Sequence, residues 1–460
     1  MKQRVVSTLL VAGAIGLATS NSALAADTPA AAAAEAAAPA LEEVTVSARK
    51  FREDLQRTGA AVAAFSASDL ERMNVAVSTD LQSFVPNLVF KRRGNSGAFG
   101  QVIKIRGIGV SDLDVPTSDP SVAVYVDGVF QAKAFGPQYE LFDVEDIEVL
   151  RGPQGTLYGK NTTGGAINFI AKKPGFETSG DIKVGLGNYN RREVEGAFQA
   201  GLIPDRLAAR VAFTYTKADG FVRNILPGAP DLEGLDQYGL RLSLSFKAND
   251  DLNFLLRYSR SEQHPQNYAI IAGSIAPGGI GGFGYYRTSD GTATGTPLAD
   301  DEVAQNFTPR RRQKNQGVAF TANWRLTPDL ALTSISSWDQ GSLFIPEGTD
   351  GAPIDVFKYI ELGKVRQVTQ DLRITSTGDS PFNFIAGAFY QHEVVFSSVE
   401  NQFFNSYDVN GDGVFDYHDC ADASFGPGTG YEIGYIINSG CRYRNAYDQI
   451  RNSWAVYSDM

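Results

Sequence analysis

The chain has 460 residues and a formal net charge of −11, with 41 basic against 52 acidic side chains. This balance argues against a nucleic-acid partner, because phosphate binding requires a basic face. Two cysteines are too few for a disulfide-scaffolded mini-protein, and the three histidines, His264, His392 and His418, are too far apart to show a zinc-binding spacing.

The first 25 residues are predicted to be a cleaved export signal. Lys2 and Arg4 form a basic start, residues 5–18 are an apolar run, and residues 23–25 are the small residues that a signal peptidase recognises. The apolar run is too short to cross a ~30 Å hydrocarbon layer as a helix, which argues against a membrane anchor. We therefore expect the mature chain to begin at Ala26.

Residues 26–50 are predicted to be a tether. Their alanine-rich tract, broken by Pro29 and Pro39, has too little hydrophobic variety to build a core. Near its end, residues 43–48 contain β-branched side chains that favour an extended conformation. Such a segment can add as an edge strand to the sheet of another protein. The alternative is that residues 43–48 form the first strand of the domain that follows.

Residues 51–175 are predicted to form a small α+β domain. Ser68 and Glu71 have the spacing of a capping box at a helix start. Ser78 is predicted to cap a second short helix that Pro86 ends. The expected strands of this domain are 102–106, 122–126, 147–150 and 166–170.

Residues 176–460 are predicted to be mainly β, because apolar and polar residues alternate in repeated stretches. In residues 238–246 the even positions are apolar or aromatic and the odd positions are small or polar, which places one face in an apolar medium and the other in a polar one. After the signal no apolar run is long enough for a transmembrane helix. The expected strands are 181–188, 192–202, 207–217, 238–248, 252–261, 316–326, 330–339, 365–376, 382–396 and 452–458.

The lengths of the connections distinguish a membrane barrel from a soluble β-sandwich. After an initial short turn at 189–191, short connections alternate with long ones, which are expected at 218–237, 262–315, 340–364 and 397–451. Tight turns at one end and long loops at the other are typical of a transmembrane antiparallel β-barrel. Because the ten predicted strands would leave two open edges in hydrocarbon, we expect this chain to be a fragment, or an early-terminated version, of a larger barrel.

Four motifs resemble, in order, those of TonB-dependent outer-membrane receptors. They are residues 105–109, 124–129, 150–159 and 164–168. The resemblance implies a four-stranded plug lodged inside a 22-stranded barrel of the cell outer membrane. We expect the motif glycines to serve turns and close backbone approach, and Arg106 and Arg151 to be candidates for pairing with acidic groups on the barrel wall. The selected plug residues are Arg106, Gly107, Arg151, Gly152, Gly155, Gly159, Gly164 and Gly165.

The resemblance also identifies a candidate TonB box at the end of the periplasmic tether. The partner would be TonB with its inner-membrane energising complex, which would pull on the box and loosen the plug. Outer-membrane lipid would surround the barrel. The expected ligand is a ferric siderophore complex, with cobalamin or an oligosaccharide as alternatives. A passive porin, the alternative from another class, would need neither plug nor box. The candidate TonB-binding residues are Glu43, Val44, Thr45, Val46, Ser47 and Ala48.

The chain shows no nucleophile, general base or catalytic metal site, so we predict neither enzymatic activity nor a catalytic cofactor. Ligand contacts are expected on the outer loops and the plug apex, although aromatic residues there could equally belong to an interfacial girdle. The candidates are Tyr285, Tyr286, Phe403, Phe404 and Tyr407.

Residues 408–419 match the twelve-residue calcium loop, with Gly413 at the turn position. Its last position is Asp where such loops use Glu, so we expect weak binding, on the order of 10⁻⁴–10⁻³ M. The alternative is an ordinary Asp/Gly-rich surface turn. A disulfide between Cys420 and Cys441 would stabilise the same outer loop by about 3 kcal/mol. The candidate calcium ligands are Asp408, Asn410, Asp412, the Val414 carbonyl, Asp416 and Asp419.

Overall fold

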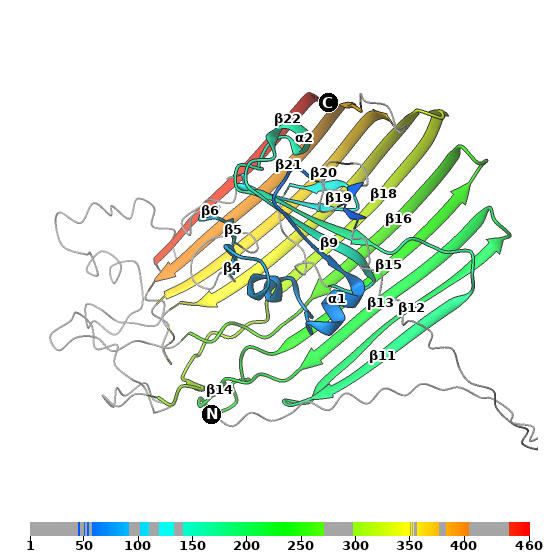
Figure 1. Ribbon diagram of the computed structural model, residues 1–460. Helices are drawn as coiled ribbons and strands as arrows, with labels where there is room; N and C mark the ends of the chain where they lie inside the picture. Colours follow the sequence, from blue (N-terminus) through cyan, green and yellow to red (C-terminus); the bar gives the residue numbers. More distant parts are fainter. Residues whose placement is uncertain are drawn as a thin grey trace, which may run out of the picture.

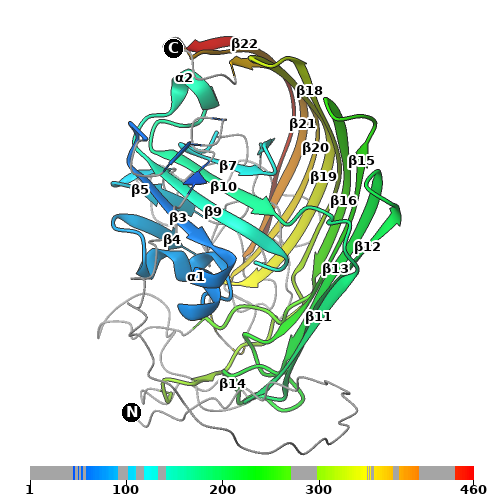
Figure 2. The ribbon, with the colours of Figure 1, turned by 45° about the vertical axis from the view of Figure 1, so that its right-hand side comes forward.

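The protein consists of a curved sheet of ten strands and a smaller domain inside its curve (Figure 1, Figure 2). The computed structural model describes residues 45–46, 50, 53–54, 58–91, 102–109, 119–132, 141–270, 298–349, 351, 353, 357–376, 383–403 and 441–460. Among these residues, no helix is both long and apolar enough to span a membrane.

All ten strands predicted after residue 175 are present, and each pairs antiparallel with its neighbour in chain order. Their bounds are β11 (Ser179–Gly187), β12 (Arg191–Ile203), β13 (Leu207–Ala218), β15 (Leu235–Lys247), β16 (Leu252–Gln263), β18 (Arg312–Thr327), β19 (Leu330–Gly348), β20 (Phe357–Ser376), β21 (Ile385–Phe403) and β22 (Cys441–Asp459).

The connections largely alternate in length as predicted, with one correction. The expected long connection 340–364 is reduced to residues 349–356, because β19 and β20 remain paired as far as Gly348 and Lys358. At the same end, two long connections pair with each other through β14 (Arg223–Asn224) and β17 (Glu302–Val303).

The two faces of the large sheet have opposite character. Leu244 and Leu256 lie directly opposite each other, Leu256 lies opposite Phe320, and all three are about two-fifths exposed. On the other face Arg210 and Arg257 are buried. An apolar outer face and a polar inner face are the arrangement of a membrane barrel, so the predicted fold class is confirmed.

The inner domain, or plug, contains a five-stranded sheet where the resemblance implied four strands. Its order is β3-β9-β10-β7-β8, and the additional strand β8 is a three-residue hairpin partner of β7. A second sheet and short helices complete the domain. The bounds are β3 (Val62–Ser66), β4 (Leu88–Lys91), β5 (Val102–Ile105), β6 (Ile108–Gly109), β7 (Val122–Val126), β8 (Val129–Gln131), β9 (Val144–Arg151), β10 (Gly165–Ala171), α1 (Ala67–Arg72), the 3-10 helix η1 (Ser78–Ser83) and α2 (Gly155–Tyr158).

Both predicted helix caps are shifted by a few residues. Helix α1 is capped by Ser66 in a capping box with Asp69, because β3 leads into the helix without a loop; the predicted Ser68–Glu71 pairing is wrong. At η1 the Asp80 carboxylate accepts 3.0 Å hydrogen bonds from the backbone of residues 76 and 77, and Ser78 is the first residue of the helix.

Candidate functional site

The described part of the candidate TonB box is packed between the plug and the wall. Residues 45–46 form β1 (Thr45–Val46), which pairs antiparallel with β2 (Glu53–Asp54). The Val46 side chain is 1% exposed and belongs to an apolar cluster with Tyr125 of the plug and Ile385 of β21. Glu43, Val44, Ser47 and Ala48 lie outside the described residues.

Lys50 attaches the segment after the box to the wall. Its Nζ lies 3.0 Å from Asp371 Oδ2 on β20 and 3.3 Å from the Tyr457 hydroxyl on β22, and it stands 4.3 Å from the centre of the Tyr457 ring. Burial lowers the pKa of Lys50, and the Asp371 carboxylate offsets part of this shift. A single buried ion pair therefore holds this segment near the short-connection ends of the strands.

The motif between β9 and β10 builds a tightly packed turn. A Cβ on Gly165 would lie 2.1 Å from the Leu150 carbonyl oxygen, so the two strands can approach closely only with glycine there. The Asn168 amide donates to Glu148 at 3.1 Å and to the Tyr158 hydroxyl at 2.8 Å. Burial raises the pKa of Tyr158. These groups have structural partners inside the plug.

The other selected motif residues lie in turns. Gly107 has φ +79 and follows Arg106 in the tight turn between β5 and β6, where the Arg106 side chain is exposed. Arg151 is the last residue of β9, and its buried Nε has no hydrogen-bond partner. Within the described ranges neither arginine forms the expected ion pair with the wall. Gly152, Gly155, Gly159 and Gly164 lie in the connection between β9 and β10.

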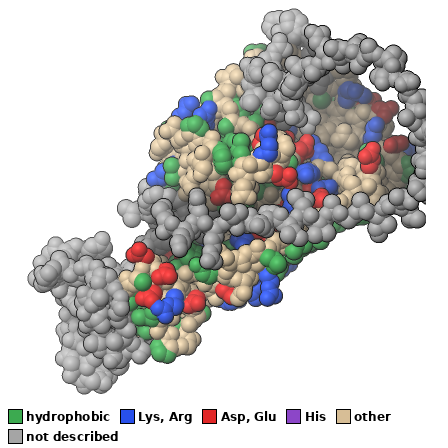
Figure 3. Space-filling view, turned by 60° about the horizontal axis from the view of Figure 1, so that its bottom comes forward, with side chains coloured by type: hydrophobic (Ala, Val, Ile, Leu, Met, Phe, Trp, Pro, Cys, Tyr) green, Lys and Arg blue, Asp and Glu red, His purple; other side chains and the backbone are tan. Residues whose placement is uncertain are grey.

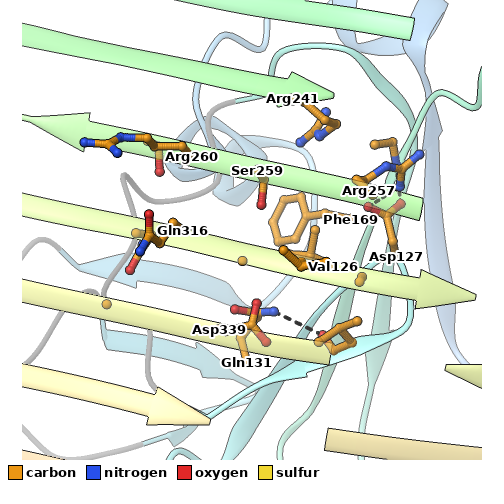
Figure 4. Close-up of a pocket in the computed structure, with 18 of the residues that line it drawn as sticks. Val126, Asp127, Gln131, Phe169, Arg241, Arg257, Ser259, Arg260, Gln316 and Asp339 are labelled. Atoms are coloured by element: carbon orange, nitrogen blue, oxygen red, sulfur yellow. Dashed lines mark hydrogen bonds and ion pairs between the residues drawn. The ribbon is translucent and has the colours of Figure 1, made fainter. Parts of the chain in front are cut away.

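The ion pairs between the plug and β13, β15 and β16 run in the opposite sense, from acidic plug residues to basic wall residues. Asp143 accepts from Arg210 Nε of β13 at 2.9 Å, and its Oδ2 lies 4.0 Å from Arg241 Nη1 of β15. Asp127 pairs with Arg257 of β16 (Figure 4). Each of these five side chains is 13% exposed or less.

Local backbone geometry presents both aspartates to the wall. Asp127 and Gly128 occupy the turn of the β7–β8 hairpin with φ 51 and 81, which is the Asp-Gly pattern of a tight hairpin. Asp143 has φ 55 at the entry to β9. Our interpretation of the sequence missed this network. The signal that could have found it is the position of Arg210, Arg241 and Arg257 on the polar face of alternating strands.

Contacts with β20 and β22 are made by different groups. Lys160 Nζ lies 3.0 Å from Ser453 Oγ, and Asp119 pairs with Arg451. The Gln367 amide donates to the Phe130 carbonyl at 2.7 Å and accepts from the backbone of residue 132 at 3.1 Å. This side is held by hydrogen bonds, by lysine amines and by the Asp119–Arg451 pair, whose side chains are 35% and 23% exposed.

A cavity of about 160 Å³ separates the plug from the wall, between Val126 and Phe169 of the plug and Ser259 and Asp339 of the strands (Figure 4). Figure 3 shows charged side chains of both signs gathered along the hollowed side of the molecule. Pockets for drug-sized ligands are roughly 300–1,000 Å³. The cavity is therefore too small for such a ligand in this arrangement.

Several predicted features lie outside the described residues. They are the export signal (1–25), the calcium loop (408–419), Cys420, Tyr285, Tyr286, Phe404 and Tyr407. Cys441 begins β22 and Phe403 ends β21, and only their backbone positions are described.

Comparison with known proteins identifies the inner domain. Residues 54–166 match the family model "TonB-dependent Receptor Plug Domain". The chain carries a TonB-dependent receptor plug. The pesticin receptor of Yersinia pestis is 34% identical over 173 residues, which are 37% of this chain and 24% of that protein. The vitamin B12 transporter BtuB of Vibrio vulnificus is 23% identical over 325 residues, 65% of this chain and 50% of that protein.

Solved TonB-dependent receptor structures share the fold. The ferric yersiniabactin uptake receptor FyuA of Yersinia pestis has a TM-score of 0.63 at 21% identity, over 75% of this chain and 50% of that one. The siderophore receptor PiuA of Acinetobacter baumannii has a TM-score of 0.59 at 18% identity, over 88% and 56%. The chain thus spans about half the length of these receptors. The predicted plug domain is confirmed over residues 54–166, and the predicted outer-membrane location agrees with these relatives.

Proposed function

We propose that the chain belongs to an energy-coupled outer-membrane receptor that imports a ferric siderophore complex. The observation that carries the proposal is a TonB-dependent receptor plug bound to the inner face of a β-barrel wall. Solved neighbours described as a ferric yersiniabactin uptake receptor and a siderophore receptor support the ligand class. The proposal assigns no enzymatic activity to the chain.

A gated route fits the geometry better than a passive porin. Among the described residues, the cavity between plug and wall is about 160 Å³, smaller than a pocket for a drug-sized ligand, which supports a plug that rearranges before cargo passes. The plug is held by buried ion pairs on several strands, and thermal opening of all of them would be rare. In the proposed mechanism, energy supplied from outside the receptor through TonB breaks these contacts.

The TonB box would be the point at which that work enters. In the proposed mechanism TonB adds a strand to residues 43–48, with main-chain hydrogen bonds providing the grip. Val46 is buried and β1 is already paired with β2, so the box must leave this position before a partner strand can bind. Continued pulling on the box would then stretch the ion pair between Lys50 and Asp371.

The test is uptake of ferric siderophores by iron-limited cells that depend on this receptor. Val46→Pro removes a backbone N–H that a partner strand would need, so we expect uptake to fall to background while the receptor remains in the outer membrane. Val46→Ala is the matched control, because it shortens the side chain and keeps the N–H. Uptake by the proline variant at the wild-type rate would refute TonB coupling through this segment.

A cobalamin importer is the second candidate, favoured by the similarity to a vitamin B12 transporter over 65% of this chain. The same cells distinguish the two ligands. The receptor could prove necessary for growth on vitamin B12 and unnecessary for growth on iron chelates. That result would refute the siderophore assignment and leave the coupling mechanism unaffected.

We further propose that residues 408–419 hold a structural Ca²⁺ in an outer loop that a Cys420–Cys441 disulfide closes. Six positions carry the oxygen ligands of a calcium loop in the right order. Calcium titration of the receptor, followed by protease protection of the loop, tests this proposal, with Asp408→Asn as the weakened variant. Unchanged cleavage up to millimolar calcium would refute it.

A further inference from the structure

A line of buried polar side chains runs along the inward face of β21 and β22, which are neighbouring strands at one edge of the large sheet (Figure 1). The three members on β21 are at most 1% exposed, and the side chains between them point outward, where Tyr390 is 45% exposed. The member on β22 lies opposite Val395 in the strand register and shares its face. We call these residues the acceptor line: Gln391, Glu393, Ser397 and Gln449.

Each member of the acceptor line has a buried oxygen that lacks a hydrogen-bond partner among the described residues. These atoms are Gln391 Oε1, Glu393 Oε1, Ser397 Oγ and Gln449 Oε1. A buried acceptor without a partner is unfavourable, because it has lost its hydrogen bonds to water and gained none in the protein. Packing gives no reason to gather four such atoms on two adjacent strands. Donors that reach them only after a rearrangement would give one.

The acceptor line is too long to be the site of a single small ion. Ser397 lies six positions from Gln391 on the same strand, so the line extends roughly 20 Å along the wall. This length is about two-thirds of the ~30 Å hydrocarbon thickness of a bilayer. The arrangement therefore suits partners that move along the wall, such as water and the donor groups of a passing molecule.

A cavity of about 90 Å³ continues the acceptor line toward the short-connection ends of the strands. Its lining includes Lys160 of the plug and Ser453, Asp371 and Tyr457 of the wall. Ser453 lies opposite Gln391 in the register, so the cavity begins where the acceptor line ends. The Lys160 amine crosses this junction and lies 3.0 Å from Ser453 Oγ. A cavity of this size with polar walls has room for a few water molecules.

The segment that carries the candidate TonB box closes the far end of this cavity. Lys50 lines the cavity, and its Nζ lies 3.0 Å from Asp371 Oδ2 and 3.3 Å from the Tyr457 hydroxyl. Val46 packs against Ile385, the first residue of β21 at the same strand end. Withdrawal of this segment would therefore open the cavity at that end in the same step that breaks the ion pair between Lys50 and Asp371.

We propose that cargo passes between the plug and β20–β22 along the acceptor line, and that the segment of the TonB box closes the periplasmic exit of this route. The inference rests on the proposed import function and adds the place of the route. Once the box segment has left, water and the O–H and N–H donors of the passing complex become the partners of the buried oxygens. The opposite side of the plug is unsuited to a route, because buried arginine pairs hold it to β13 and β16.

The experiment tethers the plug to one side of the wall at a time, in full-length receptor on iron-limited cells. Lys160→Cys/Ser453→Cys places two thiols across the route, and Glu71→Cys/Lys183→Cys places two between the plug and β11. The pairs are matched, because each replaces a lysine and the group that its amine contacts, at 3.0 and 2.6 Å. A bismaleimide that contains a cleavable disulfide joins the two thiols of each pair.

We expect the tether across the route to reduce the uptake of radiolabelled iron, supplied as a trihydroxamate chelate, to background. Cleavage of the tether should restore uptake. Binding of the chelate to de-energised cells should be unchanged, because the tether joins residues that are already in contact in the closed receptor. The tether to β11 should leave uptake at the rate of the untethered receptor. All variants carry Cys420→Ser/Cys441→Ser, so that only the introduced thiols react.

Thiol labelling provides a second measurement that does not depend on a tether. Ser397→Cys lies in the acceptor line, and Thr214→Cys lies on the inward face of β13, where Thr214 is 9% exposed. Addition of the chelate to energised cells should make the first thiol accessible to a membrane-impermeant maleimide and leave the second one protected.

Four results would overturn the route while leaving the import function in place. They are equal loss of uptake with both tethers, loss with the β11 tether alone, uptake unaffected by either tether, and labelling of Thr214→Cys without labelling of Ser397→Cys. Absence of iron uptake by the untethered receptor would instead refute the proposed import function, on which the route rests.

Discussion

The plug is attached to two parts of the wall by different chemistry. Toward β13, β15 and β16, buried arginines meet Asp127 and Asp143, which are fixed in turns of the plug sheet. Toward β20 and β22, Lys50 and Lys160 on the plug side reach a carboxylate and a hydroxyl, and the arginine pair there, Asp119 with Arg451, is more exposed, at 35% and 23%. Figure 2 shows the plug on the concave side of the curved sheet that carries both parts.

The difference predicts the order in which the plug separates from the wall. An arginine cannot lose its proton in a protein, so removing its partner leaves a buried charge at a cost of about 3–5 kcal/mol. A buried lysine can become neutral, and burial lowers the pKa of both Lys50 and Lys160. We therefore expect the plug to separate first along β20 and β22, next to the segment that TonB would pull, and to remain attached along β13–β16.

Asp143→Asn should have the largest effect, because it removes the charge that faces both Arg210 and Arg241. We expect the free energy of plug docking to fall by about 3–5 kcal/mol. Hydrogen exchange of the β9 amides in receptor extracted from outer membranes measures this loss. Protection of β9 equal to that of wild type would mean that the arginine network does not hold the plug, and the proposed order would fail.

Asp371→Asn should have a smaller and more local effect. It removes the carboxylate that pairs with Lys50 and, on the same strand, with Arg373 at 3.3 Å. The Lys50 amine can respond by losing its proton, so we expect the box segment to lose about 1–3 kcal/mol. The loss should appear as faster exchange in β1, while β9 remains protected. Tyr457→Phe is a milder companion variant, since it removes only the hydroxyl 3.3 Å from Lys50 Nζ. Equal deprotection of β1 and β9 would indicate one cooperative unit.

The strands could be predicted from sequence because their alternation is local. One buried face and one exposed face impose period two on each segment separately, and the ten strands of the large sheet were predicted from it. The extension of β19 and β20 into the expected loop was missed. It depends on pairing between residues such as Gly348 and Lys358, which neither segment reveals alone.

The plug–wall contacts could not be predicted in the same way. Arg210 and Asp143 are 67 positions apart, and alternation shows only that the arginine faces the lumen. Family resemblance drew attention to Arg106 and Arg151, which form no ion pair with the wall among the described residues. Which plug residue an arginine contacts depends on the position of the whole plug inside the sheet. The local alternation therefore predicts that the arginine faces the plug, and it does not predict which residue it pairs with.

Release of the TonB box should depend on pH through Lys50. The pKa of Lys50 is lowered from its ordinary value of 10.5 in the packed state, so that state binds the proton more weakly than the released state does. The packed state is most favoured when the pH is above the ordinary pKa of lysine. Packing weakens as the pH falls from there through the lowered pKa, by at most about 1.4 kcal/mol per pH unit. Opening of β1, measured by hydrogen exchange of its amides, should therefore become more frequent as the pH falls. Lys50→Met should abolish this pH dependence. A dependence retained in that variant would assign the titration to another group.

Glu71→Gln should have the smallest effect, although it breaks a contact between plug and wall. Glu71 pairs with Lys183 of β11 at 2.6 Å, and the two side chains are 65% and 57% exposed. Solvent screens this pair, so we expect β9 protection to change by less than about 1 kcal/mol. The pair has the same charge types as the one at Lys50 and differs in burial. Suppose that Glu71→Gln lowered the protection of β9 as strongly as Asp143→Asn does. The side of the plug that separates first would then be determined by the number of contacts with the wall and not by their burial and chemistry.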